Sequence, residues 1–150
     1  MRRVLALTAA MAAMLALAAP AGATPPSGVN IEVDTDISSP FTASGPAVDD
    51  GVVCASGVVE DVFFKASGFQ SNTGVNFQIV KEFTCDDGSG DFSVKLQVRL
   101  LFDDSPATFN WNVVDGTGAY ENLHGTGTGV GLPCDTCFVL DVYDGGLHTH

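Results

Sequence analysis

The chain has 150 residues, of which 18 are acidic and six are basic, so its formal net charge is −12. So acidic a surface repels nucleic acid and anionic lipid, because both are held by clusters of Lys and Arg. The length suits one domain with a real hydrophobic core, and no second domain is expected.

The first 23 residues are typical of a secretory signal peptide. Arg2 and Arg3 precede an apolar run rich in Ala and Leu, and small residues at 21–23 supply a cleavage site after Ala23. The alternative is an uncleaved membrane anchor, which is disfavoured because the apolar run is short for a bilayer span. We therefore expect a secreted, extracellular protein with no membrane contact once the leader is removed.

Residues 24–30 begin with a stretch rich in Pro, Gly and Ser, and we expect them to form a flexible leader. A single domain at 31–150 follows. Four basic and 18 acidic residues remain after the signal peptide, which explains solubility outside the cell.

Short runs of strand-like residues follow one another through this domain, and turn residues separate them. The first run is 31–35, and 38–51 is expected to be an irregular acidic loop. The later runs are 52–65, 75–85, 91–102, 108–114, 123–131 and 137–143. No stretch has a convincing helical period, so the fold class is all-β. The pattern predicts an antiparallel meander, closed as a barrel or stacked as a sandwich.

Apolar residues on one face of each run predict how the strands pair. Pairing Phe83 with Phe92 through the turn at 86–90 gives a consistent apolar ladder. The next hairpin is expected to set Phe102 against Phe109 in the same way.

Export makes disulfides permissible, and four cysteines allow two bridges in three pairings: Cys54, Cys85, Cys134 and Cys137. A register that pairs Phe64 with Val75 also brings Cys54 opposite Cys85, which favours a bridge between them. Cys134 and Cys137 would then bridge each other across a turn. A redox motif or a zinc site is disfavoured, because no helix N-terminus lies there and no second ligand pair has suitable spacing.

The same register places Lys81 on the apolar face, with Glu60 diagonally beside it on the neighbouring strand. A charged pair inside a barrel could bind a polar group of a ligand. The preferred alternative is a β-bulge that turns Lys81 outward, or a different register, since bulges are common in barrels.

Other polar clusters have ordinary explanations. The carboxylates of 86–91, 49–50 and 103–104 could hold Ca²⁺, but the spacing of an EF-hand loop is absent, and solvated turns explain them. No metal site is therefore expected. His124 could act as an acid or base beside Tyr120, although a polar strand residue at the rim is the simpler interpretation. His148 and His150 lie in a tail expected to fray.

The segment from Trp111 to Gly127 contains a strand, then Gly-Thr-Gly, an aromatic residue and a further Gly-x-Gly. It resembles the signature of the allene oxide cyclase and dirigent-type barrels, most closely the small secreted bacterial proteins of that type. The matching positions are Gly116, Thr117, Gly118, Tyr120, Gly125 and Gly127. The resemblance implies an eight-stranded antiparallel barrel with an apolar cavity, often oligomeric, in which this segment shapes the barrel.

The leading functional hypothesis is a secreted, disulfide-stabilised barrel that acts as a binding or structural module, with a small apolar ligand inside. The inward residues expected to line the ligand are Phe77, Ile79, Leu96, Val98 and Trp111. One alternative is a cofactor-free isomerase or cyclase that uses Glu60, Lys81, Tyr120 and His124. Another is a surface protein whose outer face binds a partner. The sequence does not decide whether the protein is an enzyme, and no cofactor is expected.

Overall fold

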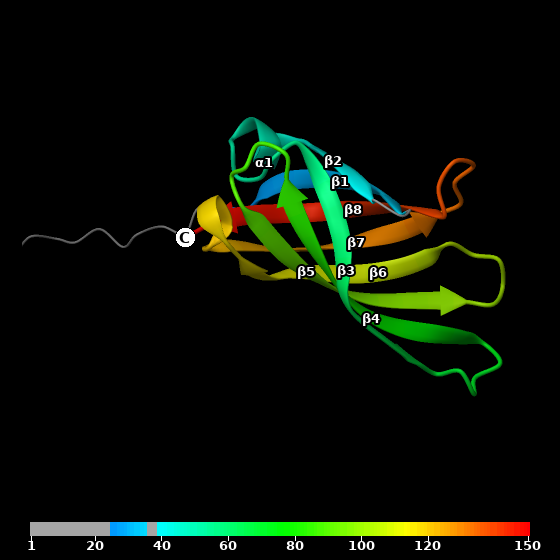
Figure 1. The fold of residues 1–150 in the computed structure, drawn as a ribbon. Helices are drawn as coiled ribbons and strands as arrows, with labels where there is room; N and C mark the ends of the chain where they lie inside the picture. The colour runs from blue at the N-terminus through cyan, green and yellow to red at the C-terminus, as the bar shows by residue number, and fades with distance from the viewer. Residues whose placement is uncertain (1–24, 36–38) are drawn as a thin grey trace, which may run out of the picture.

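Eight antiparallel strands, each paired with the next, close into a barrel in the computed structural model (Figure 1). This closure decides between the barrel and the sandwich. The structure describes residues 25–35 and 39–150, and the expected signal peptide lies outside them. Within these residues, no helix has the length and apolar character needed to span a membrane.

The elements, in chain order, are β1 (Ser27–Thr35), β2 (Pro40–Ser44), α1 (Pro46–Asp49), β3 (Ser56–Ser67), β4 (Gly74–Cys85), β5 (Asp91–Leu101), β6 (Ala107–Gly116), the 3₁₀ turn η1 (Gly118–Tyr120), β7 (Leu123–Leu132) and β8 (Val139–Thr149). β1, β2, α1 and β8 differ from expectation. The expected acidic loop contains β2 and α1. The expected leader and tail are partly strand, because Ser27 at the start of β1 pairs with Leu147 near the end of β8.

The expected register is confirmed for β4 and β5, where Phe83 lies opposite Phe92. It is wrong for the two neighbouring hairpins. Phe64 lies opposite Ile79 rather than Val75, and Phe109 lies opposite Val98 rather than Phe102. Beside each turn the strands pair four residues away from the expected register, and both strand pairs also contain a register shift. Alternation alone predicts neither feature.

The alternating Gly and Thr of β7 have a clear structural reason. Gly127 and Gly129 lie against the rings of Trp111 and Phe109, and a Cβ atom at either glycine would collide with those rings. Both rings are almost fully buried. The glycine side of β7 therefore makes room for the largest side chains of β6 inside the barrel.

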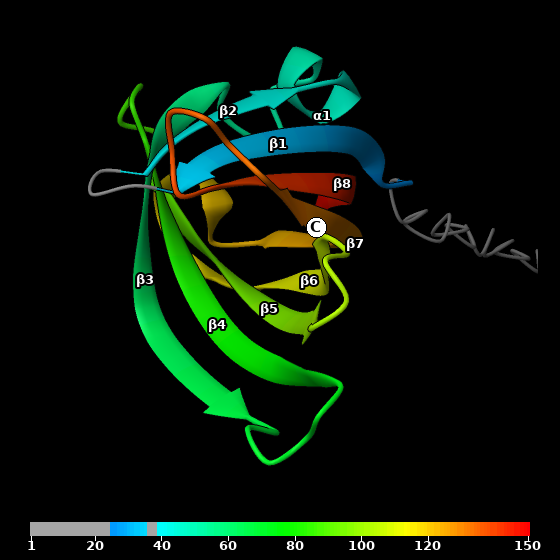
Figure 2. The ribbon, with the colours of Figure 1, turned by 90° about the vertical axis from the view of Figure 1, so that its right-hand side faces the viewer.

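The two ends of the barrel differ. At one end, here called the closed end, Ala47 of α1 and Val53 of the next loop are buried in the same core cluster as the barrel interior. An antiparallel meander places the loops after β3, β5 and β7 at the opposite end (Figures 1 and 2). These loops carry Phe69, Phe102 and Phe138, which are exposed. We call this the aromatic end. The hairpin of β3 and β4 extends beyond the other strands there.

Candidate functional site

Lys81 lies inside the barrel, with only 5 % of its surface exposed. Its Nζ is 2.8 Å from Asp61 Oδ1 and 3.8 Å from Asp141 Oδ2. Of the two preferred alternatives, the bulge that turns Lys81 outward is wrong, whereas a register different from the expected one is confirmed. The register shift occurs on the facing strand, between Asp61 and Phe63, and Asp61 lies directly opposite Lys81.

The expected partner of Lys81 occupies a different position. Glu60 is exposed and lies opposite Glu82, on the outer side of β3. The strand register differs by three residues from the expected one, and this difference replaces Glu60 with Asp61 at the lysine. The structure therefore supports an interior charged pair, in which Asp61 and not Glu60 is the partner of Lys81.

Burial makes the second carboxylate unusual. The pKa of Asp141 is raised to about 6, chiefly because burial penalises the charged form; Lys81 opposes this shift and Asp61 adds to it. Tyr143 is fully buried, and its hydroxyl has no hydrogen-bond partner among the described residues. Burial and then the charge of Asp141 raise the pKa of Tyr143 well above its ordinary value. Asp141 can therefore gain or lose a proton near neutral pH, whereas Tyr143 stays neutral.

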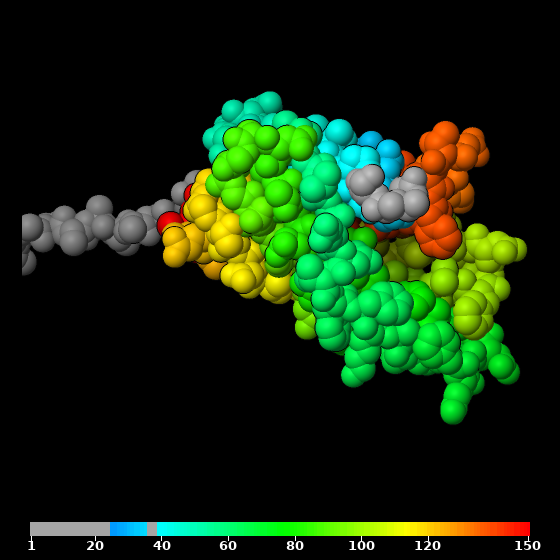
Figure 3. Space-filling model, viewed as in Figure 1, coloured from blue at the N-terminus to red at the C-terminus, as the bar shows by residue number. Residues whose placement is uncertain are grey.

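A pocket of about 560 Å³ gives access to this charged group. Its lining includes Asp61, Lys81 and Val59 of the barrel wall, and Phe138 of the β7–β8 loop. Phe138 is 89 % exposed, so one side of the pocket is an unprotected aromatic ring. In the space-filling view the β7–β8 loop and the hairpin of β3 and β4 both project at the aromatic end (Figure 3). The pocket thus combines a charged floor with an apolar rim.

The residues expected to line a ligand fall into two groups. Leu96 and Trp111 are buried in the packed core, and Trp111 Nε1 donates a hydrogen bond to the carbonyl of Thr128. The remaining three, Phe77, Ile79 and Val98, are half-buried. Large side chains fill most of the interior, including the fully buried rings of Phe41, Phe83, Phe92 and Tyr143. Of the expected lining, a ligand could therefore reach only these three half-buried side chains, which lie on strands that lead to the aromatic end.

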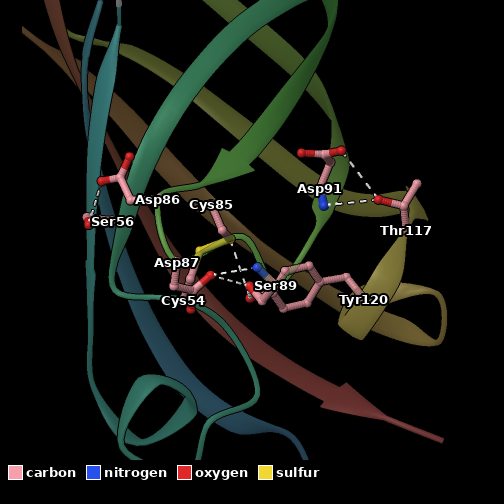
Figure 4. The surroundings of a disulfide bond; sticks show 9 residues. All are labelled: Cys54, Ser56, Cys85, Asp86, Asp87, Ser89, Asp91, Thr117 and Tyr120. Carbon is pink, nitrogen blue, oxygen red and sulfur yellow. Dashed lines mark hydrogen bonds between the residues drawn. A yellow bond between two sulfur atoms is a disulfide. The ribbon is translucent and has the colours of Figure 1, made fainter.

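Tyr120 serves the closed end, where its side chain is buried (Figure 4). Its hydroxyl lies 2.6 Å from Ser89 Oγ and 3.4 Å from Cys85 Sγ. The expected Cys54–Cys85 bridge is confirmed beside it, and so is the Cys134–Cys137 bridge. Tyr120 holds the β4–β5 turn against η1, and the first bridge ties the end of β4 to the segment before β3, so both have a structural role. Leu123 of the same glycine-rich segment is buried as well.

The four polar candidates for catalysis do not form one group. The buried Lys81 and the exposed Glu60 line the same pocket, whereas Tyr120 packs at the closed end. His124 is exposed, and its ring neighbours are His148 and His150. Sequence reasoning missed Asp61, Asp141 and Tyr143, although alternation along β8 could have indicated that Asp141 shares the inward face of Tyr143.

The acidic turns act as local caps. Asp87 Oδ1 accepts hydrogen bonds from the backbone N–H and the hydroxyl of Ser89, at 2.9 and 2.5 Å. Asp103 accepts the same pair from Ser105, and in both turns the hydroxyl is the main cause that lowers the pKa of the carboxyl. In the part of the chain that the structure describes, no three His, Cys, Asp or Glu side chains already form a group that could hold a metal.

The strongest candidate site is therefore the pocket at Lys81, which we call the lysine pocket. It offers a buried cation, two carboxylates and an aromatic rim, and it lies where the interior packing gives way to solvent. Its assignment rests on the residues of this chain, because comparisons with protein-family models, curated proteins and solved structures found no match.

Proposed function

We propose that this disulfide-stabilised barrel is a secreted binding module whose ligand occupies the lysine pocket. The observation that carries the proposal is the position of Lys81. This deeply buried side chain forms ion pairs with Asp61 and Asp141, yet it also lines a pocket open to solvent. A buried charged group at a solvent-accessible concavity is costly unless it is partnered, and such groups mark binding sites.

The surroundings of the pocket define the chemistry of the ligand. Lys81 already has two carboxylate partners, Asp61 and Asp141, whereas Glu60 is an exposed acceptor that also lines the pocket. Phe138 and the exposed ring of Phe64 supply apolar surface at the same end of the barrel. The best fit is a small molecule with an apolar body and a cationic or hydrogen-bond-donating group, the body resting on the rings and the polar group meeting the acceptors.

Binding of a neutral apolar dye, Nile red, tests the apolar part of this proposal. Phe64 lies on the same strand face as the half-buried lining, with its ring 5.4 Å from that of Phe77. Phe63 is similarly exposed, but it lies opposite Val80 on the other face. We expect Phe64→Ser and Phe138→Ser to weaken dye binding at least about fivefold, while Phe63→Ser leaves it unchanged. Equal losses in all three variants would contradict a site at the pocket.

Size-exclusion chromatography of the same variants separates ligand binding from self-association. The exposed rings of the aromatic end could also contact a second copy of the chain. A shift from dimer to monomer in Phe138→Ser, with dye binding unchanged, would favour an interface instead. Native mass spectrometry of the secreted protein would then identify any molecule that remains bound.

A family assignment belongs to this proposal as well. We propose that the barrel is of the allene oxide cyclase and dirigent type. The closed eight-stranded meander supports it, and so does the position of Gly125 and Gly127 beside the side chains of Leu147 and Trp111. In this assignment the glycine-rich segment shapes the barrel, while specificity resides in the loops.

A cofactor-free isomerase or cyclase is the second candidate, and one observation favours it. The pKa of Asp141 near 6 and its proximity to Lys81 suit a group that exchanges protons with a substrate. Asp141→Asn removes that proton exchange but keeps the shape of the side chain. Once a ligand is identified, retention of turnover in Asp141→Asn would eliminate this candidate.

A further inference from the structure

Three histidines form a cluster on the outer face of the barrel, away from the lysine pocket. His124 of β7 lies directly opposite His148 of β8, and His150 follows His148 by two residues. The ring centres are 5.7 Å apart for His124 and His148, and 4.9 Å apart for each of the other two pairs. We call these residues the histidine cluster.

We propose that the histidine cluster binds one divalent transition-metal ion, such as Zn²⁺ or Ni²⁺, through three imidazoles. Three His ligands with a water in the fourth position are an established tetrahedral set. With a metal–nitrogen bond of about 2 Å, rings around one tetrahedral ion have their centres about 5 Å apart. The observed separations already match this spacing.

A second observation also indicates a ligand. His148 Nδ1 is buried and lacks a hydrogen-bond partner within the described residues. An unsatisfied imidazole nitrogen is costly to bury, and a metal ion would satisfy it. The three side chains line a pocket of about 460 Å³. No carboxylate lines that pocket, so its donor set is imidazole, which suits Zn²⁺, Ni²⁺ and Cu²⁺ rather than Ca²⁺ or Mg²⁺.

Binding requires the rings to turn, because the side chains do not already form a metal-holding group among the described residues. The strand backbone makes this turn feasible. Directly opposed Cβ atoms in an antiparallel pair are about 5 Å apart, and residues two apart on one strand face are about 7 Å apart. His124 and His150 are exposed, so their rings are free to rotate toward His148, which is half-buried.

Titration of the metal-free secreted chain with Zn²⁺ and with Ni²⁺, followed by calorimetry, tests the site. We expect one ion per chain with micromolar or tighter affinity, and at least tenfold weaker binding in His124→Gln, His148→Gln and His150→Gln, since even outer-shell changes cost about 10–100-fold. Thr126→Ala, in the same pocket but without an imidazole, is the matched control and should bind as the wild type.

A thermal melt supplies a readout that is independent of the titration. Because a ligand that binds only the folded state raises Tm, saturating Zn²⁺ should raise the Tm of the wild type and of Thr126→Ala, but not that of the triple His→Gln variant. Full affinity in His150→Gln would reduce the site to a two-histidine contact and overturn the three-ligand proposal. Binding that survives in the triple variant, or no binding by the wild type, would also overturn it.

Discussion

At the residue scale, the carboxyl of Asp141 couples folding to pH. Its Oδ2 lies 3.8 Å from Lys81 Nζ, and burial is the main reason that its pKa is raised to about 6. The unfolded chain would titrate this group near pH 4. Folding therefore binds a proton between these two pH values.

This linkage predicts the direction of the pH dependence of stability. Because the native state holds the Asp141 proton more tightly, the free energy of unfolding should fall as pH rises from about 4 to about 6. Between pH 5 and pH 7.5 the contribution is about 1 kcal/mol. Urea unfolding at both pH values should show this loss in the wild type and not in Asp141→Asn. Asp144→Asn, an exposed change on the same strand, is the control. Parallel pH curves for the wild type and Asp141→Asn would show that the carboxyl is not perturbed.

At the element scale, the barrel depends on glycine in β7 as much as on large side chains in β6. Gly129 faces the ring of Phe109, and a methyl group there would overlap both the ring and the carbonyl of Val142. Overpacking of this kind forces side chains off their rotamers or shifts the backbone.

Gly129→Ala should accordingly lower the free energy of unfolding by about 1–3 kcal/mol or more. Gly28→Ala is the matched control, because a Cβ at Gly28 meets only Pro46 Cδ at 3.9 Å. Urea unfolding of both variants measures the difference. A stable Gly129→Ala variant with an unchanged midpoint would mean that β6 and β7 are less tightly packed than the structure shows.

The two disulfides should contribute unequally, because they close loops of different length. Cys54–Cys85 spans 31 residues and links the segment before β3 to the end of β4, whereas Cys134–Cys137 spans three. Loop-closure entropy predicts losses of about 4 and about 2 kcal/mol when each pair is replaced by Ala. Urea unfolding of the two double variants gives the comparison. A larger loss from the shorter bridge would indicate that native contacts, and not chain entropy, dominate.

The strand registers show where residue alternation is enough to predict pairing and where it is not. The register of β4 and β5 could be predicted because alternation is regular on both sides of a short turn. That of β3 and β4 could not, because both the offset at the turn, where Ser67 pairs with Asn76, and the shift after Asp61 lie within strand-like sequence. Pro40 and several small residues hid β2 in an apparent loop. The inward position of Lys81 could be predicted from the alternation of β4, whereas its partner Asp61 depends on that shift.

At the scale of the whole molecule, packing is uneven along the barrel. The stacked rings of Phe83 and Phe92 are fully buried in the interior, whereas Phe64 and Phe69 of the extended hairpin are more than half exposed. Few buried contacts and solvent-exposed backbone hydrogen bonds characterise regions that open locally.

Hydrogen exchange should reveal this gradient. We expect the slowest amides in the strand segments around Phe83 and Phe92, and faster exchange between 65 and 76, where side chains are largely exposed. Mass spectrometry of the exchanged, digested protein measures both segments in one experiment. Saturation of the lysine pocket by its ligand should slow exchange in the hairpin. Uniform protection along β3 and β4 would contradict the uneven packing.

The pairing of Ser27 with Leu147 has a consequence for how the barrel can be attached to other structures. Both ends of the barrel chain meet at the closed end, opposite the loops that carry Phe69, Phe102 and Phe138. A support, display scaffold or fusion partner joined at either end would leave those loops directed outward. The same proximity allows a short linker to connect β8 to β1, with new termini in the β3–β4 loop. Such a circular permutant keeps every strand pair, and its β3 and β4 are no longer joined by a loop.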